Sequence, residues 1–127
     1  MTDTRQPIAA GAFYEASPEP CLREATALLE SAHIDNLPTG PIRGGLLPHA
    51  GWIFSGQLAA MTLKALATPQ RPQTVVFFGA DHCGSVQCGE VYDTGAWMTP
   101  LGSALIDTQA AAALIAHGPP LRANRSA

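Results

Sequence analysis

Charged side chains are scarce in this sequence: Asp, Glu, Lys and Arg together make up 13% of its 127 residues, against roughly a quarter in an average soluble domain. The charges that are present sum to −3. A protein without a basic surface cannot neutralise phosphates, so we do not expect it to bind nucleic acid. So little surface charge is typical of a chain that is covered by a partner, or of one that has lost a covering portion.

Long apolar runs and a signal peptide are also missing. No apolar segment reaches the ~20 residues needed to cross a bilayer, and the first residues lack a charged-then-apolar pattern. The three cysteines, Cys21, Cys83 and Cys88, form no Cys-x-x-Cys pair, which argues against a disulfide framework and a zinc ribbon. We therefore expect a cytoplasmic protein with reduced cysteines and no membrane contact.

Three catalytic motifs are absent as well. The sequence has no phosphate-binding Gly-x-x-x-x-Gly-Lys-Ser/Thr loop and no Gly-x-Gly-x-x-Gly fingerprint after a predicted strand. A nucleophile elbow would need glycine two positions before Ser55, where the sequence has Ile53. Nucleotide cofactors and serine hydrolase chemistry are therefore not expected.

Three segments predict helices, because their apolar residues recur every three or four positions. They cover residues 17–33, 55–67 and 107–117. Ser17 and Asp107 are the expected N-cap residues, since their side chains can accept a hydrogen bond from the first helical turn. Each helix has one apolar face, which needs a sheet to cover it.

Two short apolar runs, 42–47 and 74–78, are typical of strands that are buried on both faces of a parallel sheet. The helix between them makes a right-handed crossover, so both strands should end at the same edge. Residues 90–94 predict a further short strand and Thr99–Gly102 a turn, whereas the tail 118–127 contains no recognisable element. The sequence therefore predicts an α/β fold, layered helix/sheet/helix with a mainly parallel central sheet, in a single domain over 1–127.

A histidine follows each of the two predicted parallel strands. His49 comes after the first strand and His82 after the second, and neighbouring strands lie about 4.8 Å apart. Imidazoles at one sheet edge could share a metal ion, and neutral imidazole suits zinc, copper and iron. The alternative is that the two histidines are separate loop residues with hydrogen bonds to the backbone.

The neighbours of His82 could contribute to such a site. Asp81 precedes it, but adjacent residues in an extended segment point to opposite sides, so Asp81 would orient a ligand or contact a substrate rather than bind the metal. Cys83 could be a thiolate ligand or a bystander in the loop. Four aromatic side chains could form the wall of a cleft for a planar or apolar ligand, although core packing is their more frequent role: Phe13, Tyr14, Trp52 and Phe54.

Several motifs resemble the Memo family, also described as AmmeMemoRadiSam system protein B. In the family's order and spacing, the matching stretches are Ala10–Tyr14, Pro48–Gly51, Ser55–Gly56, Ala59–Ala60, Gly79–His82, Thr99–Gly102 and Asp107. The family is similar in fold to the class III extradiol dioxygenases. Its members are linked to copper or iron binding and redox chemistry, and some are described as phosphopeptide binders.

The resemblance implies that His49 and His82 are metal ligands, for iron or copper and with zinc as an alternative. We also expect four residues to contact the bound group: Asp81, Phe13, Trp52 and Phe54. This sequence departs from the family at Phe13, where tryptophan is frequent, at Trp52 and Phe54, where tyrosines are frequent, and at Asp81 and Cys83, which replace serine and histidine. Phenylalanine at 54 has no hydroxyl group for a hydrogen bond to substrate.

Family members are considerably longer, and a cysteine ligand lies in a C-terminal half that this chain lacks. We therefore expect an incomplete version of a larger domain, with self-association through an exposed sheet edge. The expected function is that of a Memo-like metal-binding protein with a non-haem metal redox or dioxygenase-type role. The alternatives are a non-catalytic module that binds a small molecule or peptide in the cleft, and an inactive remnant.

Overall fold

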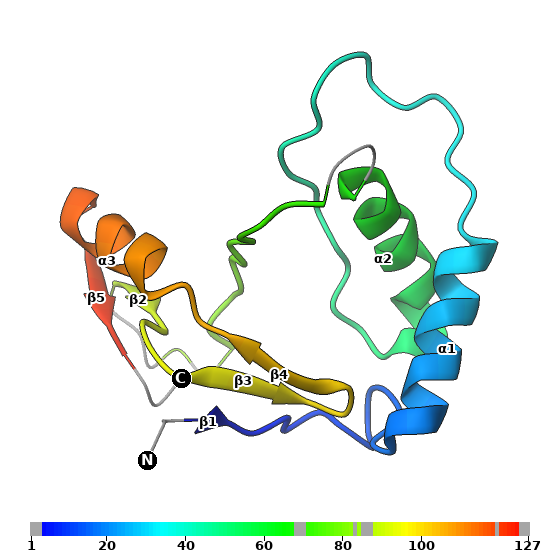
Figure 1. The fold of residues 1–127 in the computed structure, drawn as a ribbon, viewed down its shortest axis with the longest axis horizontal. Coiled ribbons are helices and arrows are strands. Elements are labelled where there is room, and N and C mark those ends of the chain that lie inside the picture. Colours follow the sequence, from blue (N-terminus) through cyan, green and yellow to red (C-terminus); the bar gives the residue numbers. More distant parts are fainter. Residues whose placement is uncertain (1–3, 68–70, 83, 85–87, 119, 125–127) are drawn as a thin grey trace. The chain divides into compact units, whose positions relative to one another are not determined.

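The structure, a computed structural model, describes residues 4–67, 71–82, 84, 88–118 and 120–124. Three helices and five short strands occur in this part of the chain (Figure 1), which confirms the predicted mixed α/β class. The chain divides into two compact units, which we call the helical unit, Ile8–Gln73, and the sheet unit, Met1–Pro7 with Thr74–Ala127. Among the described residues, no helix is long and apolar enough to cross a membrane.

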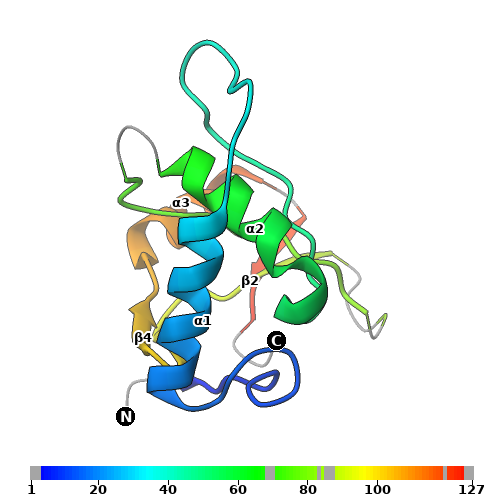
Figure 2. The same cartoon turned by 90° about the vertical axis from the view of Figure 1, so that its right-hand side faces the viewer.

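The helical unit is built from two packed helices, α1 (Pro18–Ser31) and α2 (Trp52–Leu66) (Figure 2). Gly56 allows them to approach closely, because a Cβ at this position would lie 2.8 Å from Leu28 Cδ1. The predicted helix 17–33 is confirmed, although the Ser17 side chain makes no capping hydrogen bond. The second helix begins three residues earlier than the sequence predicts.

A lysine of α2 caps the C-terminus of α1. Lys64 Nζ donates hydrogen bonds to Leu29 O at 3.0 Å and to Ala32 O at 2.8 Å. The last turn of α1 contains no basic residue of its own. Lys64 therefore supplies the positive charge that stabilises the carbonyl end of the helix dipole.

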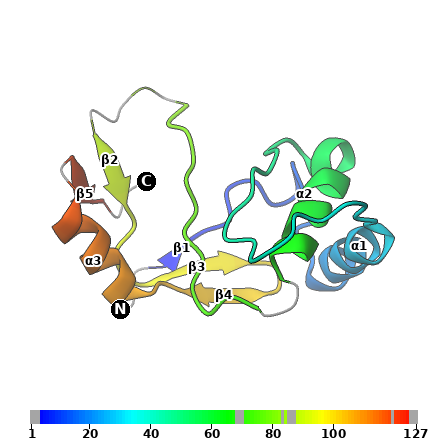
Figure 3. The ribbon, with the colours of Figure 1, turned by 90° about the horizontal axis from the view of Figure 1, so that it is seen from above.

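The sheet unit contains two small sheets and α3 (Thr108–His117) (Figure 3). The strands are β1 (Thr4–Arg5), β2 (Gly89–Val91), β3 (Ala96–Thr99), β4 (Gly102–Leu105) and β5 (Leu121–Ala123). In one sheet, β3 lies between a parallel β1 and an antiparallel β4. In the other sheet, β2 and β5 pair in parallel.

Two predictions for the sheet unit are confirmed by local hydrogen bonds. The β3–β4 turn is closed by Thr99 Oγ1, which accepts from Leu101 N at 3.1 Å and donates to Gly102 O at 2.8 Å. Asp107 caps α3 by accepting from Ala110 N at 2.9 Å. Its other carboxylate oxygen accepts from Thr74 Oγ1 at 2.5 Å, and these bonds, the Thr74 bond foremost, lower the pKa of Asp107.

The prediction of strands at 42–47 and 74–78 is wrong, because neither segment takes part in a ladder among the described residues. A strand requires a neighbouring backbone to pair with, and no described segment pairs with either run. The tail 118–127 contains a strand that the sequence did not predict. It was expected to be irregular, yet Leu121–Ala123 forms β5 because β2 provides a partner.

A charged cluster joins β5 and the residue after it to β2. Arg122 donates to Glu90 Oε1 through Nε at 2.9 Å and through Nη2 at 2.5 Å, and Asn124 Nδ2 donates to Glu90 Oε2. Only 8% of the Glu90 side chain is exposed. The hydrogen bonds from Asn124 and then from Arg122 lower the pKa of Glu90.

Lys64→Met should test the cap on α1. Methionine keeps an unbranched apolar stem but removes the charged donor from the carbonyls of Leu29 and Ala32. We expect the free energy of unfolding, measured with urea, to fall by about 1–2 kcal/mol. Lys64→Arg, which keeps the charge, is the control and should lose less. Equal stability of Lys64→Met and the unaltered protein would contradict this role.

Acidification should weaken the contact between β2 and β5. The folded-state pKa of Glu90 is lowered, so its stabilisation is fully present above the unfolded pKa of about 4.3 and is lost as the pH falls through the folded value. We expect the melting temperature to drop between about pH 5 and pH 3, and to drop less steeply in Glu90→Gln. Glu30→Gln, on exposed α1 surface, should keep the original slope. Parallel curves for all three proteins would refute the assignment.

Candidate functional site

His49 lies in the helical unit, three residues before α2, and is exposed. The segment that carries it is fixed on its C-terminal side. Ser55, which is buried in α2, donates from Oγ to Ala50 O at 3.0 Å. Trp52 N donates to Phe13 O at 2.8 Å. The backbone next to His49 is therefore anchored to α2 and to the N-terminal loop.

His82 and Asp81 lie in the sheet unit, after the apolar run 74–78, and both are exposed. Cys83, the other candidate ligand, lies outside the described residues. His49 and His82 belong to different compact units. The sharing of one metal ion by the two imidazoles therefore stays a prediction, and so does the role of Asp81.

Within the described part of the chain, no group of three or more His, Cys, Asp or Glu side chains is placed to hold a metal ion. A metal site usually needs at least three protein ligands. The described side chains therefore do not form a complete metal site by themselves. Any metal centre built on the two histidines needs a further ligand.

The predicted aromatic residues of the helical unit do come together around α2. The rings of Tyr14 and Trp52 stack with their centroids 5.4 Å apart and their planes inclined by 28°. Phe13 and Phe54 line a hollow of about 410 Å³ beside this stack. The remaining residues of its lining are Gly11, Ala12, Tyr14, Glu15, Glu24, Gly51 and Ile53.

Trp52 does not line this hollow but supports it from the first turn of α2. Its ring lies against Tyr14, and its backbone N–H holds Phe13 O. The Phe13 loop is a tight turn, in which Gly11 adopts a φ of +81° and its N–H donates to Tyr14 O at 2.7 Å. This turn was not predicted from the sequence, although glycine is the residue that a positive φ favours.

Two glutamates give the hollow a negative charge, and sequence reasoning missed both. Glu15 and Glu24 line it. The pKa of the nearby Cys21 thiol is raised, mainly by burial and then by the charges of Glu24 and Glu15. A ligand with an apolar body and a positive charge would therefore bind in this hollow more favourably than an anion.

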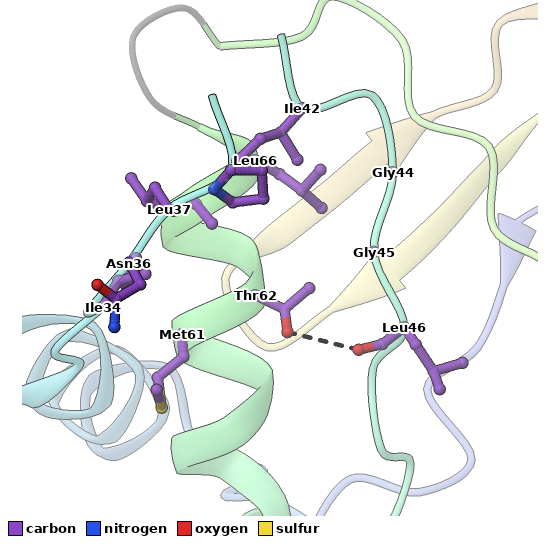
Figure 4. A pocket seen from close by; sticks show the side chains of 12 residues that line it. Ile34, Asn36, Leu37, Ile42, Gly44, Gly45, Leu46, Met61, Thr62 and Leu66 are labelled. Carbon is purple, nitrogen blue, oxygen red and sulfur yellow. Dashed lines mark hydrogen bonds between the residues drawn. The ribbon is translucent and has the colours of Figure 1, made fainter. Parts of the chain in front are cut away.

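A second, apolar hollow of about 300 Å³ lies along α2 (Figure 4). Its floor is α2, where Thr62 Oγ1 donates to Leu46 O at 3.4 Å. Gly45 passes so close to Thr62 that a Cβ would collide with the threonine methyl group. The rest of the lining is apolar apart from Asn36: Ile34, Leu37, Pro38, Ile42, Gly44, Met61, Ala65 and Leu66.

Several archaeal proteins are similar to this chain. A MEMO1 family protein of Methanopyrus kandleri is 40% identical over 120 residues, which cover 87% of this chain and 41% of that protein. A MEMO1 family protein of Pyrococcus abyssi is 38% identical over 114 residues, which cover 87% of this chain and 38% of that protein. The chain spans about two fifths of the length of these relatives.

No solved structure matches the chain. The family model described as Memo-like protein matches residues 5–126. This match includes both histidines and all the aromatic residues of the hollow, and it confirms the resemblance seen in the motifs. Because the family model covers almost the whole sequence, the chain belongs to the Memo-like protein family.

Proposed function

We propose that this chain supplies two histidine ligands, His49 and His82, to the metal centre of a Memo-like protein. The observation that carries the proposal is the anchored, exposed position of His49. The Ser55 bond to Ala50 O fixes the adjacent backbone, while the imidazole remains accessible. His82 is equally exposed at the end of its apolar run. Accessible imidazoles are suitable ligands for iron or copper, and zinc is the alternative.

The proposal includes a third ligand outside the described side chains, because these form no group of three. Asp81 is proposed as a residue that orients His82 or contacts a substrate, as carboxylates often do beside a histidine ligand. Bound iron or copper would supply redox or oxygen chemistry, and we propose a dioxygenase-type or other redox function for the complete protein. The proposed contribution of this chain is to supply two imidazole ligands.

Metal content tests the two histidines directly. We expect protein purified without oxygen to contain iron or copper, measured by elemental mass spectrometry, and His49→Ala or His82→Ala to lose most of it. Each substitution removes one of the two proposed histidine ligands. The remaining metal affinity should then be too low for the metal to stay bound during purification. His33→Ala, at another exposed histidine, is the matched control and should retain the metal. Equal metal content in all four proteins would end the proposal.

A binding function without turnover is the second candidate, and the aromatic hollow favours it. Phe13 and Phe54 line about 410 Å³ of space, which is within the range of small-molecule sites. Phe54 is 83% exposed, so its ring is available to a ligand. The carboxylates of Glu15 and Glu24 favour an aromatic or apolar cation.

Benzyltrimethylammonium is a suitable probe of this hollow, with phenylacetate as an aromatic anion for comparison. We expect saturable quenching of tryptophan fluorescence by the cation and about five-fold weaker binding in Phe54→Ala, a loss of about 1 kcal/mol. Leu58→Ala, one turn further along α2 and outside the lining, should bind like the unaltered protein. The candidate fails if the anion binds as tightly as the cation, or if Phe54→Ala changes nothing.

A further inference from the structure

Two hydroxyl groups of α2 hold the backbone on either side of His49. Ser55 Oγ donates to Ala50 O, directly after the histidine, at 3.0 Å. Thr62 Oγ1 donates to Leu46 O, on the other side of the histidine, at 3.4 Å (Figure 4). All of these residues belong to the helical unit. The stretch from Leu46 to Ala50, here called the tethered segment, is therefore attached to one helix at both ends.

The Ser55 bond is unusual for a serine within a helix. Such a side chain ordinarily donates to the carbonyl four residues earlier, which here is Gly51 O at 3.5 Å. The shorter bond goes instead to Ala50 O, which precedes the N-cap residue of α2. Because Ser55 is only 7% exposed, the bond is shielded from competition by water. Ser55 is therefore a firm attachment for the end of the tethered segment that lies next to His49.

Thr62 makes the second attachment, which is a shared one. A hydroxyl group has a single hydrogen to donate, and Thr62 has two acceptors within reach, Leu46 O and, at 3.2 Å, Leu58 O of the preceding turn. Contact at this end is reinforced by Gly45, where a Cβ would collide with the threonine methyl group. We therefore expect Thr62 to contribute less than Ser55, but at the opposite end of the tethered segment.

The spacing of the two attachments leaves the tethered segment little slack. Ser55 and Thr62 lie two turns apart on one face of α2, about 10 Å along its axis. The chain between their acceptors could span at most about 14 Å when fully extended. Pro48 restricts this chain further because its ring fixes φ, and Leu47 before it is confined to extended conformations. His49 therefore belongs to a segment with few alternative conformations.

We propose that Ser55 and Thr62 are positioning residues for His49, through which α2 raises the affinity of the chain for metal without touching the metal. This inference rests on the proposed function, in which His49 is a ligand. A histidine on a mobile segment loses conformational freedom when it binds a metal, and this loss costs free energy. A segment that is already held in place loses less. The two hydroxyl groups therefore act on the metal affinity through the backbone.

Backbone dynamics test the first step, in the metal-free chain labelled with ¹⁵N. We expect Ser55→Ala to lower the order parameter of the His49 amide from about 0.85 toward about 0.6, because one end of the tethered segment is then released. Ser31→Ala is the matched control. It also removes a helical hydroxyl of this unit, one that donates to Gln57 Oε1, and it should leave the His49 amide unchanged. An unaltered order parameter in Ser55→Ala overturns the proposal.

Copper binding tests the second step, with Cu²⁺ added to the metal-free chain and the bound ion followed by electron paramagnetic resonance. We expect about ten-fold weaker binding in Ser55→Ala. Thr62→Val keeps the shape of the side chain but removes its hydroxyl, and should show a smaller loss. Thr62→Ser retains the hydroxyl and should bind like the unaltered chain. The two threonine variants decide the question if Ser55→Ala does not fold.

The pattern of losses separates this proposal from the proposed function. Weaker binding in Ser55→Ala and Thr62→Val, with normal binding in Ser31→Ala, supports the positioning role. If His49→Ala loses Cu²⁺ while Ser55→Ala and Thr62→Val keep their affinity, the positioning role is wrong and the histidine ligand stands. If His49→Ala binds Cu²⁺ as tightly as the unaltered chain, the proposed function fails, and the positioning role fails with it.

Discussion

A β-strand depends on a neighbouring backbone, and this constraint governs the rest of the molecule. The helices satisfy their hydrogen bonds within their own segments, so α1, α2 and α3 form with the residues present. The apolar runs Gly44–Leu47 and Val75–Phe78 cannot satisfy theirs alone. Because His49 and His82 each follow one of these runs, the placement of the proposed metal ligands depends on the backbone conformation of the two runs.

The sequence predicted those parts of the fold that local interactions determine. Asp107 caps α3 through a bond to a residue three positions away, and Thr99 closes its turn through bonds to residues two and three positions away. The early start of α2 was not predicted, because it depends on a distant group. Trp52 N–H donates to Phe13 O, a contact between segments that are far apart in the sequence.

Short strands and the aromatic hollow were predicted less well, for the same reason. β1 and β5 span two and three residues, too few to show a periodic pattern, and β5 is held by the bonds of Arg122 to Glu90. Phe13 and Phe54 were assigned to a cleft wall by their residue type, and both line the hollow. Glu24 was not assigned, because no spacing along the chain relates a helical glutamate to that loop.

The two proposed imidazole ligands would be thermodynamically coupled to the group that supplies a third ligand. Two imidazoles without a third ligand bind metal weakly, so a group that brings a further ligand would raise the metal affinity. By linkage, bound metal would then stabilise the form that contains the third ligand by the same free energy. The metal and the third ligand would therefore each raise the affinity of this chain for the other.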